Sequence, residues 1–127
     1  MRLIFGGAFQ GKLDYALETY KINKEDVYTC KSDSMEIDFS KKIIDNLEEF
    51  VYACAENKVE AKTILESHKE ELKDKIIICD DISQGVVSMV RLERDWREMV
   101  GRTMLMLGKE SQEVVRIFCG IPDKLKG

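Results

Sequence analysis

The sequence predicts a three-layer α/β fold in which helices cover both faces of a five-stranded, mostly parallel sheet. Two observations carry this prediction. Segments rich in Val and Ile alternate along the chain with amphipathic segments of helical period. The apolar segments are continuous runs, which is the pattern of strands buried on both faces. The 127 residues show no internal repeat and no boundary, so we expect a single domain over residues 1–127.

The first half of the chain alternates strands and helices. The apolar run RLIF stops at Gly6, as a buried strand that enters a loop would. After that loop, apolar residues recur at i, i+3, i+4 and i+7, which predicts a helix. Residues 31–40 are polar and predict a loop. In chain order we expect strand 2–5, helix 12–20, strands 26–30 and 42–45, and helices 46–56 and 59–72.

The second half begins with KIIIC, the clearest buried strand of the chain. In chain order we expect strand 75–79, loop 80–88, helix 90–107 and strand 114–119, followed by a tail. Gly101 is expected to interrupt the long helix, and Gly108 is a plausible C-cap for it.

Composition narrows the class of protein. The net charge of −4 and the pI near 5.1 argue against general nucleic-acid binding, which needs a basic face. No apolar run approaches the roughly 18 residues of a membrane span, and MRLIF is not a signal peptide, so we expect a cytoplasmic protein. The four cysteines form no C-x-x-C pair, which favours buried free thiols over a metal site or a disulfide framework.

The segment GGAFQGKL satisfies the phosphate-loop pattern G-x-x-x-x-G-K between a strand and a helix. Glycines let backbone N–H groups surround an anion, and the helix N-terminus adds positive charge. The alternative is a glycine-rich turn with an accidental lysine. The pattern predicts a P-loop NTPase-like fold whose nucleotide-binding residues are Gly6, Gly7, Ala8, Phe9, Gln10, Gly11, Lys12 and Leu13.

Leu13 stands where the pattern requires a hydroxyl for Mg²⁺. A leucine offers no oxygen to the ion, and phosphoryl transfer depends on the charge neutralisation that the metal supplies. We therefore expect anion binding to survive better than catalysis and predict no metal site on the protein itself. Asp14 could supply an oxygen, but helix geometry is expected to turn it elsewhere.

Acids at strand ends are candidates for a place beside the phosphates. Asp45 ends one predicted strand, and Asp80 and Asp81 follow another. The predicted catalytic residues are Lys12, Asp45 and Asp81. The competing interpretation of each acid is a helix cap or a loop residue.

Several separate segments together resemble one family. Its loop pattern is G-G-A-R-S-G-K-S, and its N-E-V-G-x-G-I-V-P segment corresponds to residues 80–88. Its R-x-x-R-x-x-R-D-x-x-G-R pattern is matched by Arg91, Arg94, Arg97, Glu98, Gly101 and Arg102. Its G-I-P tail with lysine corresponds to residues 119–126. On these segments the chain resembles the bifunctional adenosylcobinamide kinase / adenosylcobinamide-phosphate guanylyltransferase family of cobalamin biosynthesis.

The resemblance implies a nucleoside triphosphate, GTP or ATP, as cofactor, cobinamide as a second substrate, and a homo-oligomer, a trimer in the family. It leaves the choice between GTP and ATP, and the need for Mg²⁺, open. Beyond Leu13, the chain departs from the family at Ser88, which replaces a proline, and at Met104 and Leu105. The family histidine that becomes guanylylated is also missing, and His68 is expected to be a surface helix residue.

The four arginines of the long helix have two interpretations, contact with phosphate or salt bridges to Glu93, Glu98 or a neighbouring subunit. Trp96 is expected to pack or to contact a subunit. For the whole chain we expect a nucleotide-binding protein with impaired or lost catalysis. The alternatives are an active small kinase of cobinamide salvage and a non-catalytic structural subunit that partners an active relative.

Overall fold

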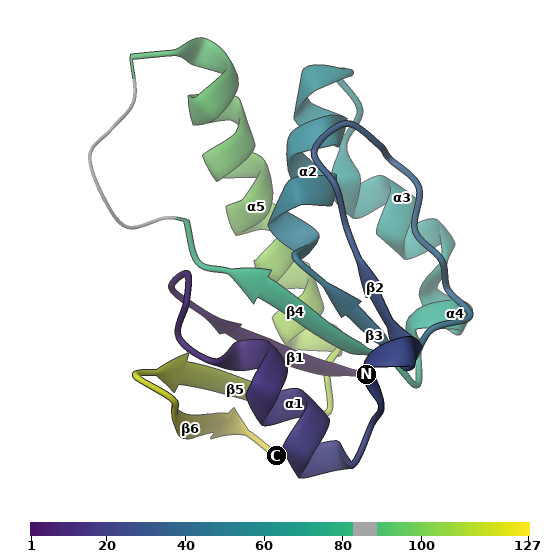
Figure 1. Ribbon diagram of the computed structural model, residues 1–127. Coiled ribbons are helices and arrows are strands. Elements are labelled where there is room, and N and C mark those ends of the chain that lie inside the picture. The colour runs from purple at the N-terminus through teal and green to yellow at the C-terminus, as the bar shows by residue number, and fades with distance from the viewer. Residues whose placement is uncertain (83–88) are drawn as a thin grey trace.

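The computed structural model describes residues 1–82 and 89–127 and arranges them as a sheet between two layers of helices (Figure 1). The strands are β1 (Arg2–Gly6), β2 (Val27–Thr29), β3 (Ile43–Asp45), β4 (Ile76–Asp80), β5 (Glu113–Phe118) and β6 (Ile121–Lys126). The helices are α1 (Lys12–Tyr20), α2 (Leu47–Glu56), α3 (Ala61–Ser67), α4 (Lys69–Leu72) and α5 (Arg91–Glu110). A short 3₁₀ helix spans Lys24–Asp26. The predicted α/β class is confirmed.

The described strands form one sheet in the order β2-β3-β4-β1-β5-β6. Strands β1 to β5 run parallel, and β6 runs antiparallel to β5. In this arrangement β1 lies between β4 and β5, and Gly6 at its end is in register with Asp80. The carboxyl ends of β1, β3 and β4 therefore meet at one edge of the sheet, where the loop after β1 begins.

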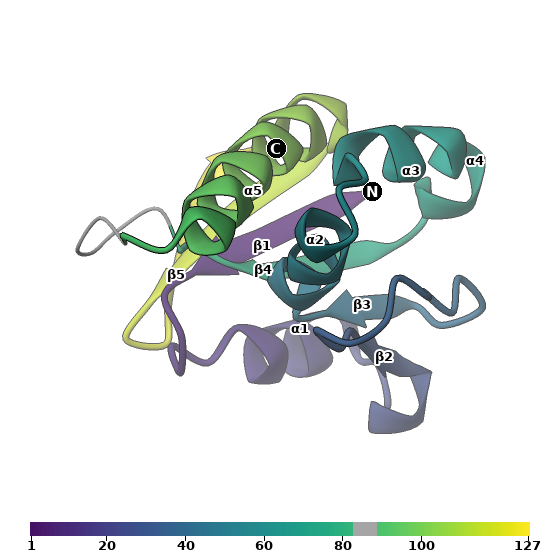
Figure 2. The same cartoon turned by 90° about the horizontal axis from the view of Figure 1, so that it is seen from above.

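Helix α1 covers one face of the sheet, and α2, α3, α4 and α5 lie over the other (Figure 2). Consecutive strand residues point to opposite faces, and on the inner strands both faces are buried. Leu3 packs under the four-helix layer, for example, while Ile4 packs against α1. The same division separates Ile77 from Ile78. Burial on both sides explains why these strands are continuous apolar runs in the sequence.

The expected tail is a sixth strand, so the prediction of five strands was one short. Cys119 and Gly120 have φ values of 51° and 75°, and they form a tight turn that folds β6 back onto β5. Every residue of β6 is exposed. Its sequence contains charges and a proline and lacks the apolar signal of a buried strand, which is why the pattern did not predict it. Ion pairs such as Arg116 to Asp123, at 3.0 Å, cross the hairpin.

The long helix α5 runs through both of its glycines, which corrects the expected interruption at Gly101 and cap at Gly108. Each glycine costs a helix about 1 kcal/mol relative to alanine. The burial of Val100 and Leu107 in the hydrophobic core offsets that cost. The Lys126 ammonium donates to the Gly108 carbonyl at 3.1 Å, so the C-terminal end of α5 is held by β6.

The helix expected over 59–72 divides at His68 into α3 and α4. Residues 83–88, which include Ser88 and most of the family segment after β4, lie outside the described residues. Within the two described ranges, no helix combines the length and the apolar character that crossing a membrane requires.

Candidate functional site

The loop between β1 and α1 has the backbone of a tight glycine turn. Gly6 and Gly11 have φ values of 151° and 86°, and Phe9 between them has a φ of 59°. Gly11 is the N-cap of α1, so the first free N–H groups of the helix face the loop. The strand, loop and helix that a phosphate site requires are therefore present at Gly6–Lys12.

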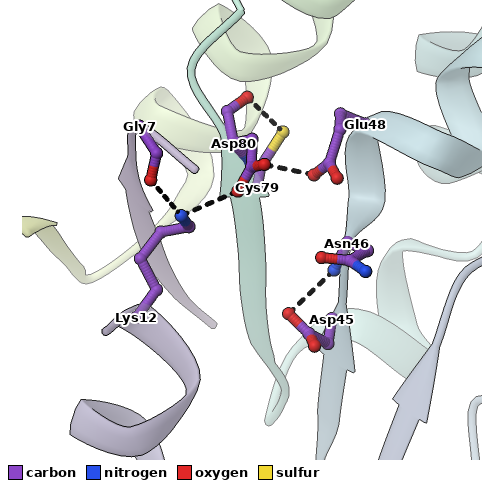
Figure 3. Close-up of polar contacts among 7 residues, drawn as sticks. All are labelled: Gly7, Lys12, Asp45, Asn46, Glu48, Cys79 and Asp80. Carbon is purple, nitrogen blue, oxygen red and sulfur yellow. Dashed lines mark hydrogen bonds and ion pairs between the residues drawn. The ribbon is translucent and has the colours of Figure 1, made fainter. Parts of the chain in front are cut away.

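The Lys12 side chain lies at the centre of the site (Figure 3). Its Nζ donates to the Gly7 carbonyl at 2.6 Å and lies 2.7 Å from Asp80 Oδ1. Only 6% of the lysine surface is exposed. The lysine that the loop pattern predicts is therefore present, and it is already paired with a carboxylate.

Asp80 is a strand-end acid whose carboxylate lies beside Lys12. Asp80 ends β4 beside Gly6, which brings its carboxylate to the lysine. The Asp81 N–H donates to the Gly6 carbonyl at 2.7 Å, so this residue fastens the start of the loop through its backbone. Neighbouring side chains at the end of a strand point to opposite sides, and sequence alone could not decide which acid would face the lysine.

Asp45 lies at the end of β3, as predicted, and is 8% exposed. One carboxylate oxygen accepts the Asn46 N–H at 2.9 Å. Burial raises the pKa of Asp45, the negative Asp80 adds to the increase, and the Asn46 hydrogen bond and Lys12 oppose it. The predicted pair Lys12 and Asp45 thus belongs to one electrostatic cluster.

Glu48 was not predicted as a site residue. It lies in the first turn of α2 with 3% of its surface exposed, and its Oε1 accepts the Asp80 N–H at 2.9 Å. Burial raises the pKa of Glu48 to about 7. Figure 3 shows Lys12 and Glu48 reaching Asp80 from opposite sides. The sequence offered one signal for Glu48, its position three residues after the strand-end Asp45. An exposed glutamate in the first turn of a helix has the same spacing, so the signal did not single Glu48 out.

A cleft of about 320 Å³ connects the loop to these acids. It is lined by Ala8, Phe9, Gln10, Gly11, Lys12, Leu13, Asp14, Asp45, Asn46, Glu48, Glu49 and Asp80. Leu13 borders the cleft and also packs against the core on the α1 side. Asp14 borders the cleft too. Among the described lining residues, Lys12 is the single cation beside five carboxylates.

The loop is fastened to the β5–β6 turn. The Gln10 side-chain oxygen accepts the Cys119 N–H at 2.5 Å, and the Gln10 carbonyl accepts the Gly120 N–H at 3.0 Å. Residues 119–126, the tail segment of the family resemblance, therefore hold the loop in place through hydrogen bonds to Gln10. Cys119 itself is exposed, unlike Cys30, Cys54 and Cys79, so the expectation of buried thiols was wrong for this residue.

The arginine helix supports the salt-bridge interpretation, with acids other than those expected. Arg91 lies 3.9 Å from Asp95, and Arg102 lies 2.9 Å from Glu60. These pairs border a different hollow from the loop cleft. The roles of Arg94 and Arg97 stay predictions.

Trp96 and His68 each pack against an aromatic ring. The Trp96 ring meets Tyr52 edge-on, and its N–H donates to the Glu48 carbonyl at 2.8 Å. The packing role expected for Trp96 is therefore confirmed. His68 stacks on Phe39 with ring centroids 4.5 Å apart and does not line the loop cleft. In the described residues no group of three Cys, His, Asp or Glu side chains is arranged to hold a metal ion.

Comparison with known proteins gives one family. The family model described as cobinamide kinase / cobinamide phosphate guanyltransferase matches residues 42–125, about two thirds of the chain. The match contains Asp45, Glu48 and Asp80 and begins after the glycine loop. No curated protein matches the sequence.

Proposed function

Because the chain belongs to the cobinamide kinase / cobinamide phosphate guanyltransferase family, we propose that it binds a nucleoside triphosphate on the loop Gly6–Leu13. The process in which it acts is cobalamin biosynthesis, where the family's reactions occur. Phosphoryl transfer by this chain is impaired or lost in our proposal. GTP and ATP are the candidate nucleotides, and cobinamide is the candidate acceptor.

The observation that carries the binding proposal is the position of Lys12 at the base of a strand–loop–helix turn. Its ammonium lies beside the Gly7 carbonyl, where an anion held by the loop N–H groups would meet it. Gly11 opens α1 with positive φ, so the helix N-terminus faces the same point. The family match does not cover this loop, and its geometry supports the proposal independently.

The observation that carries impaired catalysis is Leu13. Magnesium takes oxygen ligands, and the side chain at this position of the loop has none. The residues present therefore do not fit Mg²⁺ at its usual place on the loop. Lys12 would bind and orient the phosphates. Asp45 and Asp80 border the same cleft as Lys12 and are the candidate acids beside the bound phosphates.

Isothermal titration calorimetry with GTP and with ATP, each with and without Mg²⁺, tests the proposal. We expect binding that depends only weakly on Mg²⁺. Lys12→Met is the control, because it keeps the apolar stem and removes the ammonium, and it should weaken binding by about tenfold or more. Strong Mg²⁺-dependent binding accompanied by cobinamide phosphorylation would contradict the loss of catalysis.

A structural subunit is the second candidate function. It is favoured by exposed apolar side chains on the loop and the hairpin, namely Phe9, Phe118, Ile121 and Leu125. Association of this chain with copies of itself, or with an active relative, would cover them. Sedimentation velocity over a concentration series tests self-association. If the chain stays monomeric at every concentration and binds neither nucleotide, the structural role requires a partner of different sequence.

A further inference from the structure

We propose that Asp80 sets the anion affinity of the loop, because its carboxylate competes with phosphate for the Lys12 ammonium. The inference rests on the proposed function, since it assumes that the loop is a phosphate site. Binding is then an exchange reaction in which Lys12 leaves Asp80 and pairs with the incoming phosphate.

The competition follows from how Lys12 is satisfied. A lysine ammonium has three N–H donors. One is directed to the Gly7 carbonyl at 2.6 Å and one to Asp80 Oδ1 at 2.7 Å. With 6% of the residue exposed, water is a poor replacement for either partner. A phosphate that recruits Lys12 must therefore displace the carboxylate from a formed ion pair.

The backbone that carries the Asp80 carboxylate is held in place for this contact. Its own N–H donates to Glu48 Oε1 at 2.9 Å, and the next N–H, of Asp81, donates to the Gly6 carbonyl at 2.7 Å. Strand pairing with β1 fixes the same stretch of backbone. The backbone at position 80 consequently loses no further freedom when the ion pair forms, which makes Asp80 a preorganised competitor.

The surrounding charges increase the effect. Once Lys12 turns to a phosphate, Asp80 remains next to the buried Asp45, and the two negative groups interact unfavourably. The described cleft residues offer no second cation to neutralise them. An amide of similar shape at position 80 would remove the competitor while it keeps the backbone hydrogen bonds.

The test is calorimetric titration of Asp80→Asn with inorganic triphosphate in the absence of Mg²⁺. We expect its dissociation constant to fall by about tenfold or more relative to the unmodified chain. Asp74→Asn is the matched control, because it removes one charge from an exposed acid before the opposite end of β4. It should change the constant by less than about twofold, as a distant exposed charge does in salt.

The same substitution in a Lys12→Met background separates competition from general repulsion. Without the ammonium there is no ion pair to break, so Asp80→Asn should improve any residual binding by less than about threefold. An equal gain in both backgrounds would overturn the inference, because the carboxylate would then act only through its charge.

The two proposals fail differently. If the unmodified chain binds triphosphate and folded Asp80→Asn binds no more tightly, the competition is refuted and the phosphate site stands. If neither protein binds triphosphate, the phosphate site is refuted and the inference with it. Thermal unfolding reports whether Asp80→Asn is folded, and Asp80→Ser replaces it in the same titration if it is not.

Discussion

A methyl group on Gly6 would lie 2.3 Å from the carbonyl oxygen of Ile117. The two residues belong to neighbouring strands, and Gly6 has a φ of 151°. A side chain at this point would meet backbone that cannot move without disturbing β5. The first glycine of the loop is thus required by the packing of two strands, whatever the loop binds.

Gly6→Ala should lower the free energy of unfolding by about 3 kcal/mol or more, from the clash and the strained φ together. Urea unfolding followed by circular dichroism measures the change. Gly101→Ala is the matched control, because a methyl group there has nothing within 4 Å and the residue lies inside α5. It should raise the free energy of unfolding by about 0.5–1 kcal/mol. A Gly6→Ala protein as stable as the unmodified chain would contradict the close approach of Gly6 to Ile117.

Leu13→Ser restores the hydroxyl that the loop pattern places beside Mg²⁺. We expect the affinity for GTP or ATP to become more dependent on Mg²⁺, by about tenfold, because the ion gains an oxygen ligand. Calorimetry with and without the metal measures it. Leu13→Ala, which shortens the side chain without an oxygen, is the control for the lost packing. Should Leu13→Ser behave like Leu13→Ala, the loss of metal chemistry extends beyond this residue.

Glu48 makes stability depend on pH. Its pKa rises from 4.5 to about 7 on folding, so the folded chain binds a proton that the unfolded chain has released. The contribution of Glu48 to stability is therefore lost as the pH rises from 4.5 to 7, by about 3 kcal/mol. The free energy of unfolding of Glu48→Gln minus that of the unmodified chain should rise by that amount over this interval. A difference that stays flat in urea titrations at several pH values would refute the shift.

The four cysteines should differ in reactivity. Burial raises the pKa of Cys30 to about 12 and that of Cys54 to about 11, and Cys79 is also buried. Cys119 is exposed on the β5–β6 turn. An aromatic disulfide reagent should therefore modify one thiol per folded chain and all four after unfolding. Cys119→Ser should abolish the rapid reaction, and a second fast thiol would show that one of the buried sites opens.

Much of the fold follows from local pattern. The continuous apolar runs of β1, β3 and β4 predict a parallel sheet because only strands buried on both faces need them. The bounds of α1 agree with the prediction to the residue. The exceptions are elements that tertiary contacts decide. Strand β6 exists because the Cys119–Gly120 turn lays it on β5, and α5 is continuous because its buried face outweighs its glycines.

The candidate site divides in the same way. The order of residues along the chain was enough to predict a glycine loop with a lysine between a strand and a helix, a leucine in place of a metal ligand, and acids at the strand ends. Three-dimensional packing was needed to show that Lys12 pairs with Asp80, that the Asp81 N–H binds the Gly6 carbonyl, and that Glu48 binds the Asp80 N–H. Sequence spacing cannot show which distant residues meet in the folded chain. The register of β4 beside β1 brings Asp80 to the loop, and the packing of α2 brings Glu48 to Asp80.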